Sequence, residues 1–344
     1  MKMQLTTLAA AIALSASAVS WADARDPVYE VNGNTINNGK GAFDQQGTIR
    51  SDMDGWDSLN IDNGTIGVRE TDHDQVNQTG STLNSAQDGT EQYSEILQSG
   101  PNGGSSSGNE AYVDQGSGGS EQNVSLIQQI NGSTNRADVI QKGNGYNESR
   151  IVQQYGDSNT ATVNQYGTTD QSDILQTNGN LNTAEVNQYG GSYNQSIIVQ
   201  RNGDSNMALV EQRNSNWSDS YILQDGNDNT ADVRQRNNSN YSDSIIRQVG
   251  NNNTAEVDQQ NNSEQTWSFI EQRGEEHLAE VTQNDADLSA SYIYQGGNVG
   301  GHEAYVTQTN ESGSLSMVRQ NGSAAIANHN QTGGSGNVAS SYQW

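Results

Sequence analysis

Two short patterns of alternating polar and apolar residues follow one another along the chain from Ser94 onward. The first reads S-x-I-x-Q and the second reads N-x-A-x-V-x-Q, where x is any residue. Residues two apart lie on the same face of a β-strand, so each pattern predicts a strand with its named residues on one face. Examples are Ser149, Ile151 and Gln153 for the first pattern, and Asn159, Ala161, Val163 and Gln165 for the second.

The two patterns recur in ten units with a common step of 23 or 24 residues. The segments between the predicted strands are rich in Gly, Asn and Asp, which tolerate the positive φ of tight turns. Each unit is therefore predicted to be strand, turn, strand, turn.

Such units build either a meander of antiparallel hairpins or a solenoid in which each unit is one rung. The constant register favours the solenoid, because rungs ~4.8 Å apart then place Ser on Ser, Ile on Ile and Gln on Gln. A meander would not need the same residue at the same place in every unit. The predicted fold is all-β: a β-solenoid of about ten strand-turn-strand rungs that form two stacked parallel sheets, amyloid-like in their spacing.

Polar side chains on the inward face of the strands are predicted to form ladders. A buried Gln or Asn amide is costly unless it is hydrogen-bonded, and an amide stacked on an identical amide can both donate and accept along the column. We therefore predict that these columns hold the rungs together and act as the recognition code for self-assembly. The predicted ladder residues are Ser149, Gln153, Asn159, Gln165, Ser172, Gln176, Asn182, Gln188, Ser196, Gln200, Asn206, Gln212, Ser220, Gln224, Asn229, Gln235, Ser244, Gln248, Asn253, Gln259, Ser268, Gln272, Gln283, Gln295, Gln308, Gln320 and Gln331.

The composition limits how such a chain can be stabilised. Leu, Ile, Val and Phe make up only 56 of the 344 residues, and the formal net charge is −26. This composition is typical of disordered chains and speaks against an ordinary globular core of this length. With 15 Lys and Arg against 41 Asp and Glu, the chain has no basic surface for nucleic acid. Cys is absent, which excludes disulfides, thiol chemistry and Cys-ligated zinc.

The N-terminal residues have the layout of a secretory signal, with a basic start, a short apolar run and an A-x-A site that ends at Ala24. The run is too short to span a bilayer, and no later segment is long or apolar enough. The predicted parts are a signal peptide (1–24), an N-terminal low-complexity segment with a possible role in export (25–85), ten repeats (86–334) and a C-terminal tail (335–344).

Ser, Gln, Asn, Ala and Gln at these spacings resemble the curlin repeat of bacterial curli fimbriae over about 94–331. The resemblance implies a secreted structural subunit, either major subunit or nucleator, that self-assembles into extracellular amyloid fibres for adhesion and biofilm matrix. It also implies a Gram-negative source, polymerisation with itself or a sister subunit, and export through an outer-membrane channel with accessory factors. The departures from the pattern are His277 and His302 in place of Asn, Ala325 and His329 in place of Asn and Val, and an insertion from Pro101 to Gly108.

The two kinds of strand differ on their outward faces. An apolar strip on the first strands needs a cover, which we expect from lateral pairing of fibres or from residues 25–85. An acidic row on the second strands is expected to be solvated, and its repulsion should make assembly faster with added salt or falling pH. The strip comprises Ile197, Tyr221, Ile245, Phe269, Tyr292 and Met317 with Leu97, Val152, Leu175, Val199, Leu223 and Tyr294, and the row comprises Asp138, Glu185, Asp232, Glu256 and Glu280.

No catalytic chemistry is evident in the sequence. Of the four histidines, His277, His302 and His329 stand in ladder columns, and no P-loop, catalytic triad or calcium-binding nonapeptide is present. We therefore predict no enzyme activity, no metal site and no cofactor. The alternative function is a monomeric surface-binding β-solenoid, such as an adhesin. A solenoid enzyme acting on polysaccharide is a third possibility, and it would need a cluster of carboxylates or His in one groove.

Overall fold

The computed structural model of the protein describes residues 28–31, 34–37, 70–76, 78–79, 82–87, 92–100, 106–116, 123–143, 145–297 and 300–344. The predicted signal peptide lies outside these residues, as do most of the N-terminal segment and most of the insertion that begins at Pro101. The described residues form strands and turns but no helix, and so none of them forms an apolar helix that could cross a membrane.

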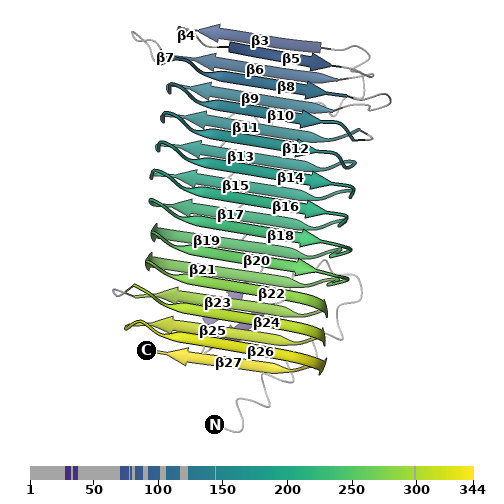
Figure 1. Ribbon diagram of the computed structural model, residues 1–344, viewed down its shortest axis with the longest axis vertical. Helices are drawn as coiled ribbons and strands as arrows, with labels where there is room; N and C mark the ends of the chain where they lie inside the picture. Colours follow the sequence, from purple (N-terminus) through teal and green to yellow (C-terminus); the bar gives the residue numbers. More distant parts are fainter. Residues whose placement is uncertain are drawn as a thin grey trace.

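Two parallel β-sheets of twelve and eleven strands run along the solenoid (Figure 1). Strands alternate between the sheets along the chain, so a rung is one strand of the first sheet, a turn and one strand of the second sheet. This confirms the predicted solenoid and excludes the meander. The first sheet contains β3 (Glu70–Val76), β6 (Tyr93–Ser99), β9 (Val124–Ile130), β11 (Glu148–Gln154), β13 (Gln171–Thr177), β15 (Gln195–Arg201), β17 (Asp219–Asp225), β19 (Asp243–Asn251), β21 (Trp267–Glu275), β23 (Ala290–Gly296), β25 (Leu315–Asn321) and β27 (Val338–Gln343).

The second sheet contains β5 (Thr82–Gln87), β8 (Glu110–Gln115), β10 (Arg136–Gln141), β12 (Thr160–Gln165), β14 (Thr183–Tyr189), β16 (Met207–Arg213), β18 (Thr230–Arg236), β20 (Thr254–Gln260), β22 (Leu278–Asp287), β24 (Glu303–Ser312) and β26 (Ile326–Ser335). Two small pairs lie outside the main sheets. They are the antiparallel hairpin of β1 (Val28–Val31) with β2 (Asn34–Asn37), and the parallel pair of β4 (Gln78–Thr79) with β7 (Ser106–Ser107).

The register between rungs pairs each repeat residue with its own kind. Between β17 and β19, for example, Ser220 lies opposite Ser244, Ile222 opposite Ile246, and Gln224 opposite Gln248. A one-residue slip would turn every inward side chain outward, so the buried face fixes this register.

The core between the two sheets is a thin line of aliphatic side chains. Most repeats contribute one Ile from the first sheet and one Ala and one Val from the second, and the resulting cluster runs unbroken from Ile96 to Ala327. At the C-terminal end the core becomes polar, since Ser341 lies opposite Val318 and His329 lies opposite Val306.

Close stacking of the turns requires glycine at one position of each rung. A Cβ atom on Gly156 would lie 1.9 Å from the carbonyl oxygen of Gly179, and one on Gly179 would lie 1.9 Å from that of Gly203. No side chain fits in such a contact, so these glycines allow the rungs to approach to hydrogen-bonding distance.

The strands extend beyond the stretch in which the sequence shows repeats. At the N-terminal end β3 and β5 pair in register with β6 and β8. At the C-terminal end β27 pairs with β25, although its residues belong to the predicted tail. β27 keeps the repeat glutamine as Gln343 but has Ala339 and Ser341 in place of Ser and Ile. The backbone pairing and one amide are sufficient to continue the sheet there.

Candidate functional site: the polar ladders

Two unbroken columns of glutamine side chains run through the solenoid, one in each sheet. In the first sheet every Gln Nε2 donates to the Gln Oε1 of the next rung, from Gln98 to Gln343, over 2.8–3.0 Å. The second sheet has the same arrangement from Gln115 to Gln331, over 2.8–3.0 Å. The geometry is that of a cross-β amide ladder within one chain.

The same amides also bind the backbone where it leaves one sheet and enters the other. Gln224 Nε2 donates to the carbonyl oxygen of Asn229 in its own rung at 3.0 Å and to that of Met207 at 2.9 Å. Gln248 repeats this with Asn253 and Thr230 at 3.0 and 2.8 Å. These buried carbonyls therefore have partners, and each glutamine links its neighbours along the axis to a turn.

The predicted asparagine column lies in the turns that precede the strands of the second sheet. Its Oδ1 accepts from the backbone N–H of the next column residue, as between Asn159 and Asn182 at 2.9 Å. Its Nδ2 donates to the glycine carbonyl of the next rung, as from Asn182 to Gly203 at 2.9 Å. The asparagine column thus fixes both the turn conformation and the stacking of the turns.

A second column of this kind was missed by the sequence analysis. It lies in the turns that precede the strands of the first sheet, two residues before each repeat serine, and begins as asparagine and ends mostly as serine. Asn147 Oδ1 accepts from the backbone N–H of Asp170 at 3.0 Å, and Ser314 N donates to Ser289 Oγ at 3.2 Å. The column was not recognised because its residue type changes along the chain, although its members keep the spacing of the repeat serines. Its members are Asn123, Asn147, Asp170, Asn194, Ser218, Ser242, Thr266, Ser289, Ser314 and Asn337.

The repeat serines are buried but do not make a continuous ladder of their own. Ser244 and Ser268 donate across the core to glutamine Oε1 atoms of the second sheet, at 2.8 and 3.0 Å. Among the described serines of this column, only Ser220 donates to a neighbouring one, Ser196, at 3.1 Å. The serine column therefore joins the two sheets more than it joins successive rungs.

Asp170 occupies an asparagine position and lacks the amide that the position calls for. Its Oδ1 accepts from the backbone and side-chain N–H groups of Asn194, while its buried Oδ2 has no hydrogen-bond partner. Burial raises the pKa of this carboxyl to about 7, partly offset by the bonds from Asn194. A proton on Oδ2 would supply the donor that asparagine has there.

Histidines at asparagine positions continue the column with a ring nitrogen in place of Oδ1. The backbone N–H of His302 donates to His277 Nδ1 at 3.3 Å, which requires that this nitrogen carry no proton, and the two rings stack with centroids 5.0 Å apart. Burial, with a smaller contribution from His302, lowers the pKa of His277. In the last rung His329 contacts Ser316 and Ser341 at 2.8 and 2.6 Å, and burial lowers its pKa too.

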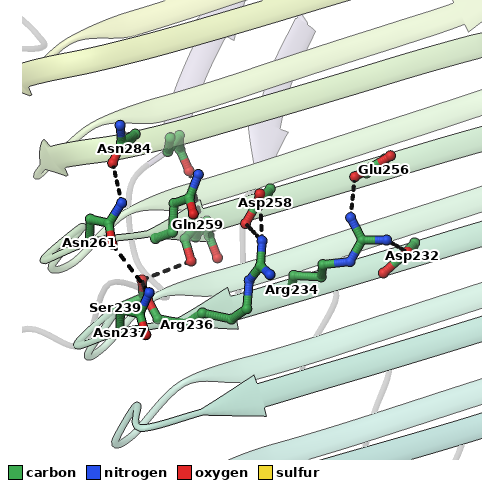
Figure 2. A network of polar contacts seen from close by, with 12 residues as sticks. Asp232, Arg234, Arg236, Asn237, Ser239, Glu256, Asp258, Gln259, Asn261 and Asn284 are labelled. Carbon is green, nitrogen blue, oxygen red and sulfur yellow. Dashed lines mark hydrogen bonds and ion pairs between the residues drawn. The ribbon is translucent and has the colours of Figure 1, made fainter.

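The outer face of the second sheet carries the predicted acidic row, and arginines neutralise part of it (Figure 2). Arg234 forms ion pairs with Asp232 of its own strand and with Glu256 of the next rung. Arg236 pairs with Asp258 at 2.8 Å. Burial raises the pKa of Asp232 to about 6. The expectation of a fully solvated acidic row is wrong in these rungs, because a guanidinium two residues along the strand reaches carboxylates of two rungs.

Within the part of the chain that the structure describes, no group of three or more His, Asp or Glu side chains could hold a metal ion. The chemistry of the described residues is that of repeated hydrogen bonding along one axis.

Comparison with known proteins identifies the repeat. The curlin associated repeat matches residues 156–190 and 226–260. The first match spans β12 to β14 with the turns around them, and the second spans β18 to β20. A search of the curated proteins finds no significant match to the chain.

Replacing a single ladder glutamine should destabilise the solenoid. In Gln224→Leu the side-chain volume is kept, but Gln200 Nε2 and Gln248 Oε1 lose their ladder partners and two turn carbonyls lose a donor. We expect a loss of ~2–4 kcal/mol in the free energy of unfolding. The measurement is urea unfolding of dilute monomer followed by circular dichroism. The control is Gln260→Leu, at a half-exposed position, which should change stability by less than ~0.5 kcal/mol; equal effects of the two substitutions would contradict the ladder.

Asp170→Asn should stabilise the protein at neutral pH and remove part of its pH dependence. The folded-state pKa lies above the ordinary value, so the folded protein binds the proton more tightly and gains stability as the pH falls from about 7 to about 4. Asparagine has no such titration and supplies the missing donor. We expect a gain of up to about 4 kcal/mol at pH 8 that shrinks towards pH 4, measured as the difference in unfolding free energy from the unaltered protein. A pH-independent difference would refute the assignment.

His277→Asn should have the opposite pH signature. The folded-state pKa is lowered from 6.5, so the unaltered protein loses stability as the pH falls through about 6.5, where the unfolded chain takes up the proton first. A proton on Nδ1 would also remove the acceptor for the backbone N–H of His302. The variant, with a permanent Oδ1 acceptor, should be close to the unaltered protein at pH 8 and more stable at pH 5. A variant that loses as much stability on acidification as the unaltered protein would show that His277 does not titrate in this way.

Proposed function

Because the chain is a curlin-repeat protein, we propose that it is a secreted structural subunit that self-assembles end to end into extracellular, curli-like amyloid fibres. The proposal includes a role in adhesion and biofilm matrix, and polymerisation with itself or with a sister curlin subunit. The observation that carries it is that, among the described residues, both sheets end at parallel strands with no further strand beside them, at β3 and β27 in the first sheet and at β5 and β26 in the second.

The two ends of the solenoid are complementary. Every ladder bond points the same way, with Nε2 donating towards the C-terminal rung, so Gln331 and Gln343 are the last acceptors of the two columns. Their own Nε2 atoms donate to backbone carbonyls and would donate next to the glutamines of an added rung. At the other end, Gln75 of β3 and Gln87 of β5 stand at the register positions of the same columns. A second copy that adds head to tail would continue both ladders and the backbone pairing. Such a heterologous contact does not close on itself and gives a filament.

The edges of the described solenoid also lack the usual protection against such addition. Solenoids that stay monomeric have terminal units or helices that cover their edge strands. Here the strand order of the first sheet ends at β27 and that of the second at β26, and no described residue lies over either edge as a further strand. His329 and Ser341 make the last rung polar inside, but their backbones keep the parallel pairing.

The weak core and the acidic charge fit a chain that is exported before it folds. With few large apolar side chains and a net charge of −26, the unfolded chain resists collapse and aggregation. Passage through an outer-membrane channel of a Gram-negative cell, with accessory factors, is part of the same proposal. The proposal also includes cleavage of the signal peptide predicted over residues 1–24.

A monomeric surface-binding solenoid is the second candidate, and one column of exposed rings favours it. Tyr193, Trp217 and Tyr241 stack along one edge of the solenoid, with ring centroids 4.3 and 6.5 Å apart, and are 45–49% exposed. Each has a positive φ, a conformation in which bulky residues are strained. The same turn position has a positive φ in other rungs too, as at Thr169 and Gln265, so the exposed rings themselves are the feature that favours binding.

Fibre growth of the mature chain distinguishes the two candidates. We expect filaments whose diffraction has a meridional reflection near 4.8 Å, the rung spacing. The variant with Gln331→Leu and Gln343→Leu should elongate preformed seeds at least about tenfold more slowly, since each junction between two chains loses two ladder bonds. Asn328→Leu, an exposed position on the same last rung, is the control and should elongate normally. A mature chain that stays monomeric for days would favour the monomeric adhesin.

A further inference from the structure

The outer face of the first sheet is buried, unlike that of the second sheet. From β11 to β25 the apolar side chains of one cluster on this face are at most 6% exposed, whereas Leu209, an apolar outward residue of the second sheet, is only half-buried. The comparison is direct, because Leu209 and Leu223 both lie outward in the middle of adjacent rungs. The buried cluster comprises Val152, Leu175, Ile197, Val199, Tyr221, Leu223, Ile245, Trp267, Ala290, Leu315 and Met317, with Phe269, Tyr292 and Tyr342 packed against it.

Polar groups on the same face are buried as well. Arg150, Asp173, Asp219 and Asp243 are at most 3% exposed, and each of them has an interaction partner. The hydroxyl of Tyr221 is buried without a hydrogen-bond partner among the described residues, and burial raises its pKa. Charges and hydroxyls are not buried in this way on the open face of a two-layer solenoid. A further layer that carries polar groups must lie over the first sheet.

The chain before β3 is suited to form that layer. In both figures the purple β1–β2 hairpin is drawn behind the strands of the solenoid, and Figure 1 places it at the level of the C-terminal rungs. β3, to which the chain then leads, lies at the opposite end (Figure 1). Residues 38–69 therefore connect, along the sequence, two elements that lie near opposite ends of the solenoid.

Residues 38–69 are long enough to cover the outer face of the first sheet, and they include side chains that complement its apolar and charged groups. Extended chain covers ~3.3 Å per residue, so residues 38–69 reach ~100 Å, about twice the ~50 Å from β3 to β25 at ~4.8 Å per rung. The segment carries Trp56, Ile61 and Ile66, which could pack on the apolar cluster. It also carries Lys40 and Arg50, which have the charge that buried carboxylates of the face require.

We infer that residues 25–69 of the mature chain lie along the outer face of the first sheet as a third layer, from about β11 to β25. The occupant is thus the chain's own N-terminal segment and not a neighbouring filament. The layer leaves the edge strands free, so growth along the axis continues, while side-by-side association through the first sheet is blocked. Filaments of the full mature chain are single for this reason, and filaments without the segment bundle. The inference is independent of the proposed function, because it concerns the monomer.

Cysteine labelling tests the layer directly, since the chain has no cysteine of its own. Ile197→Cys and Leu223→Cys place a thiol on the covered face, and Thr162→Cys places one on the half-exposed outer face of the second sheet as the matched control. In the dilute mature chain, we expect maleimide to react at least about tenfold more slowly at 197 and 223 than at 162. In the chain lacking residues 25–69, all three positions should react at similar rates.

Labelling of the mature chain and of the chain lacking residues 25–69 shows whether this segment is the cover. Equal reactivity of all three positions in the mature chain, with the unaltered circular dichroism spectrum, would overturn the inference. Protection that survives removal of residues 25–69 would overturn it too, because the cover would then be another copy. A cysteine variant that loses its folded spectrum is replaced by Val152→Cys, at another rung of the same face. Fibre growth is scored separately by diffraction, so failure of the third layer and failure of polymerisation are distinguishable.

Discussion

The structure depends on one interaction, the hydrogen bond from the side-chain amide of a buried glutamine to the same amide one rung away. Burying a side-chain amide costs free energy unless both its N–H donor and its carbonyl acceptor are hydrogen-bonded. A neighbour of the same kind, one rung up and one rung down, satisfies both. The requirement that glutamine face glutamine explains the constant register of the strands, since one residue inserted within a strand would turn the side chain outward.

Stacking compensates for the shortage of apolar residues. Few side chains are available for a core, and the line of Ile, Val and Ala between the sheets is correspondingly thin. Asparagine, glutamine and glycine, which are unfavourable in most cores, here bind the turns of one rung to those of the next. Stability therefore grows with the number of rungs, as expected for a quasi-one-dimensional protein, and a terminal rung is always less stable than an internal one. Addition of another chain turns a terminal rung into an internal one and so stabilises it. This gain in stability is the physical link between the fold and polymerisation.

The sequence predicted the parts of the structure in which one residue type recurs. The glutamine columns, the Ile and Val lines and the asparagine column could be read from spacing, because each depends on a single face of a strand or a single turn position. The column through Asn147 and Ser314 could not, since its residue type changes from asparagine to mostly serine along the chain and only the shared role as acceptor for a backbone N–H unites its members. β27 was not predicted because Ser341 stands where the repeat has an apolar core residue. The repeat pattern is defined by side chains, whereas β27 joins the sheet through its backbone pairing with β25.

Contacts between side chains of different columns could not be predicted from the sequence either. The periodicity places Asp232 and Arg234 on one outward face, but the pairing of Arg234 with Glu256 depends on side-chain reach between rungs. The burial of Tyr221 on the outer face of the first sheet is not signalled by the repeat either. Alternation distinguishes inward from outward positions, and it carries no information about a further layer.

Hydrogen exchange of the glutamine side-chain amides, followed by NMR on the monomeric mature protein, tests the central claim most directly. If the ladders hold the rungs together, the amide protons of Gln176, Gln200 and Gln224 should exchange at least ~100-fold more slowly than those of Gln260, and as slowly as the backbone amides of the same strands. Ladder amides that exchange as fast as the amide of Gln260 would contradict the account, because the buried columns would then be open to water.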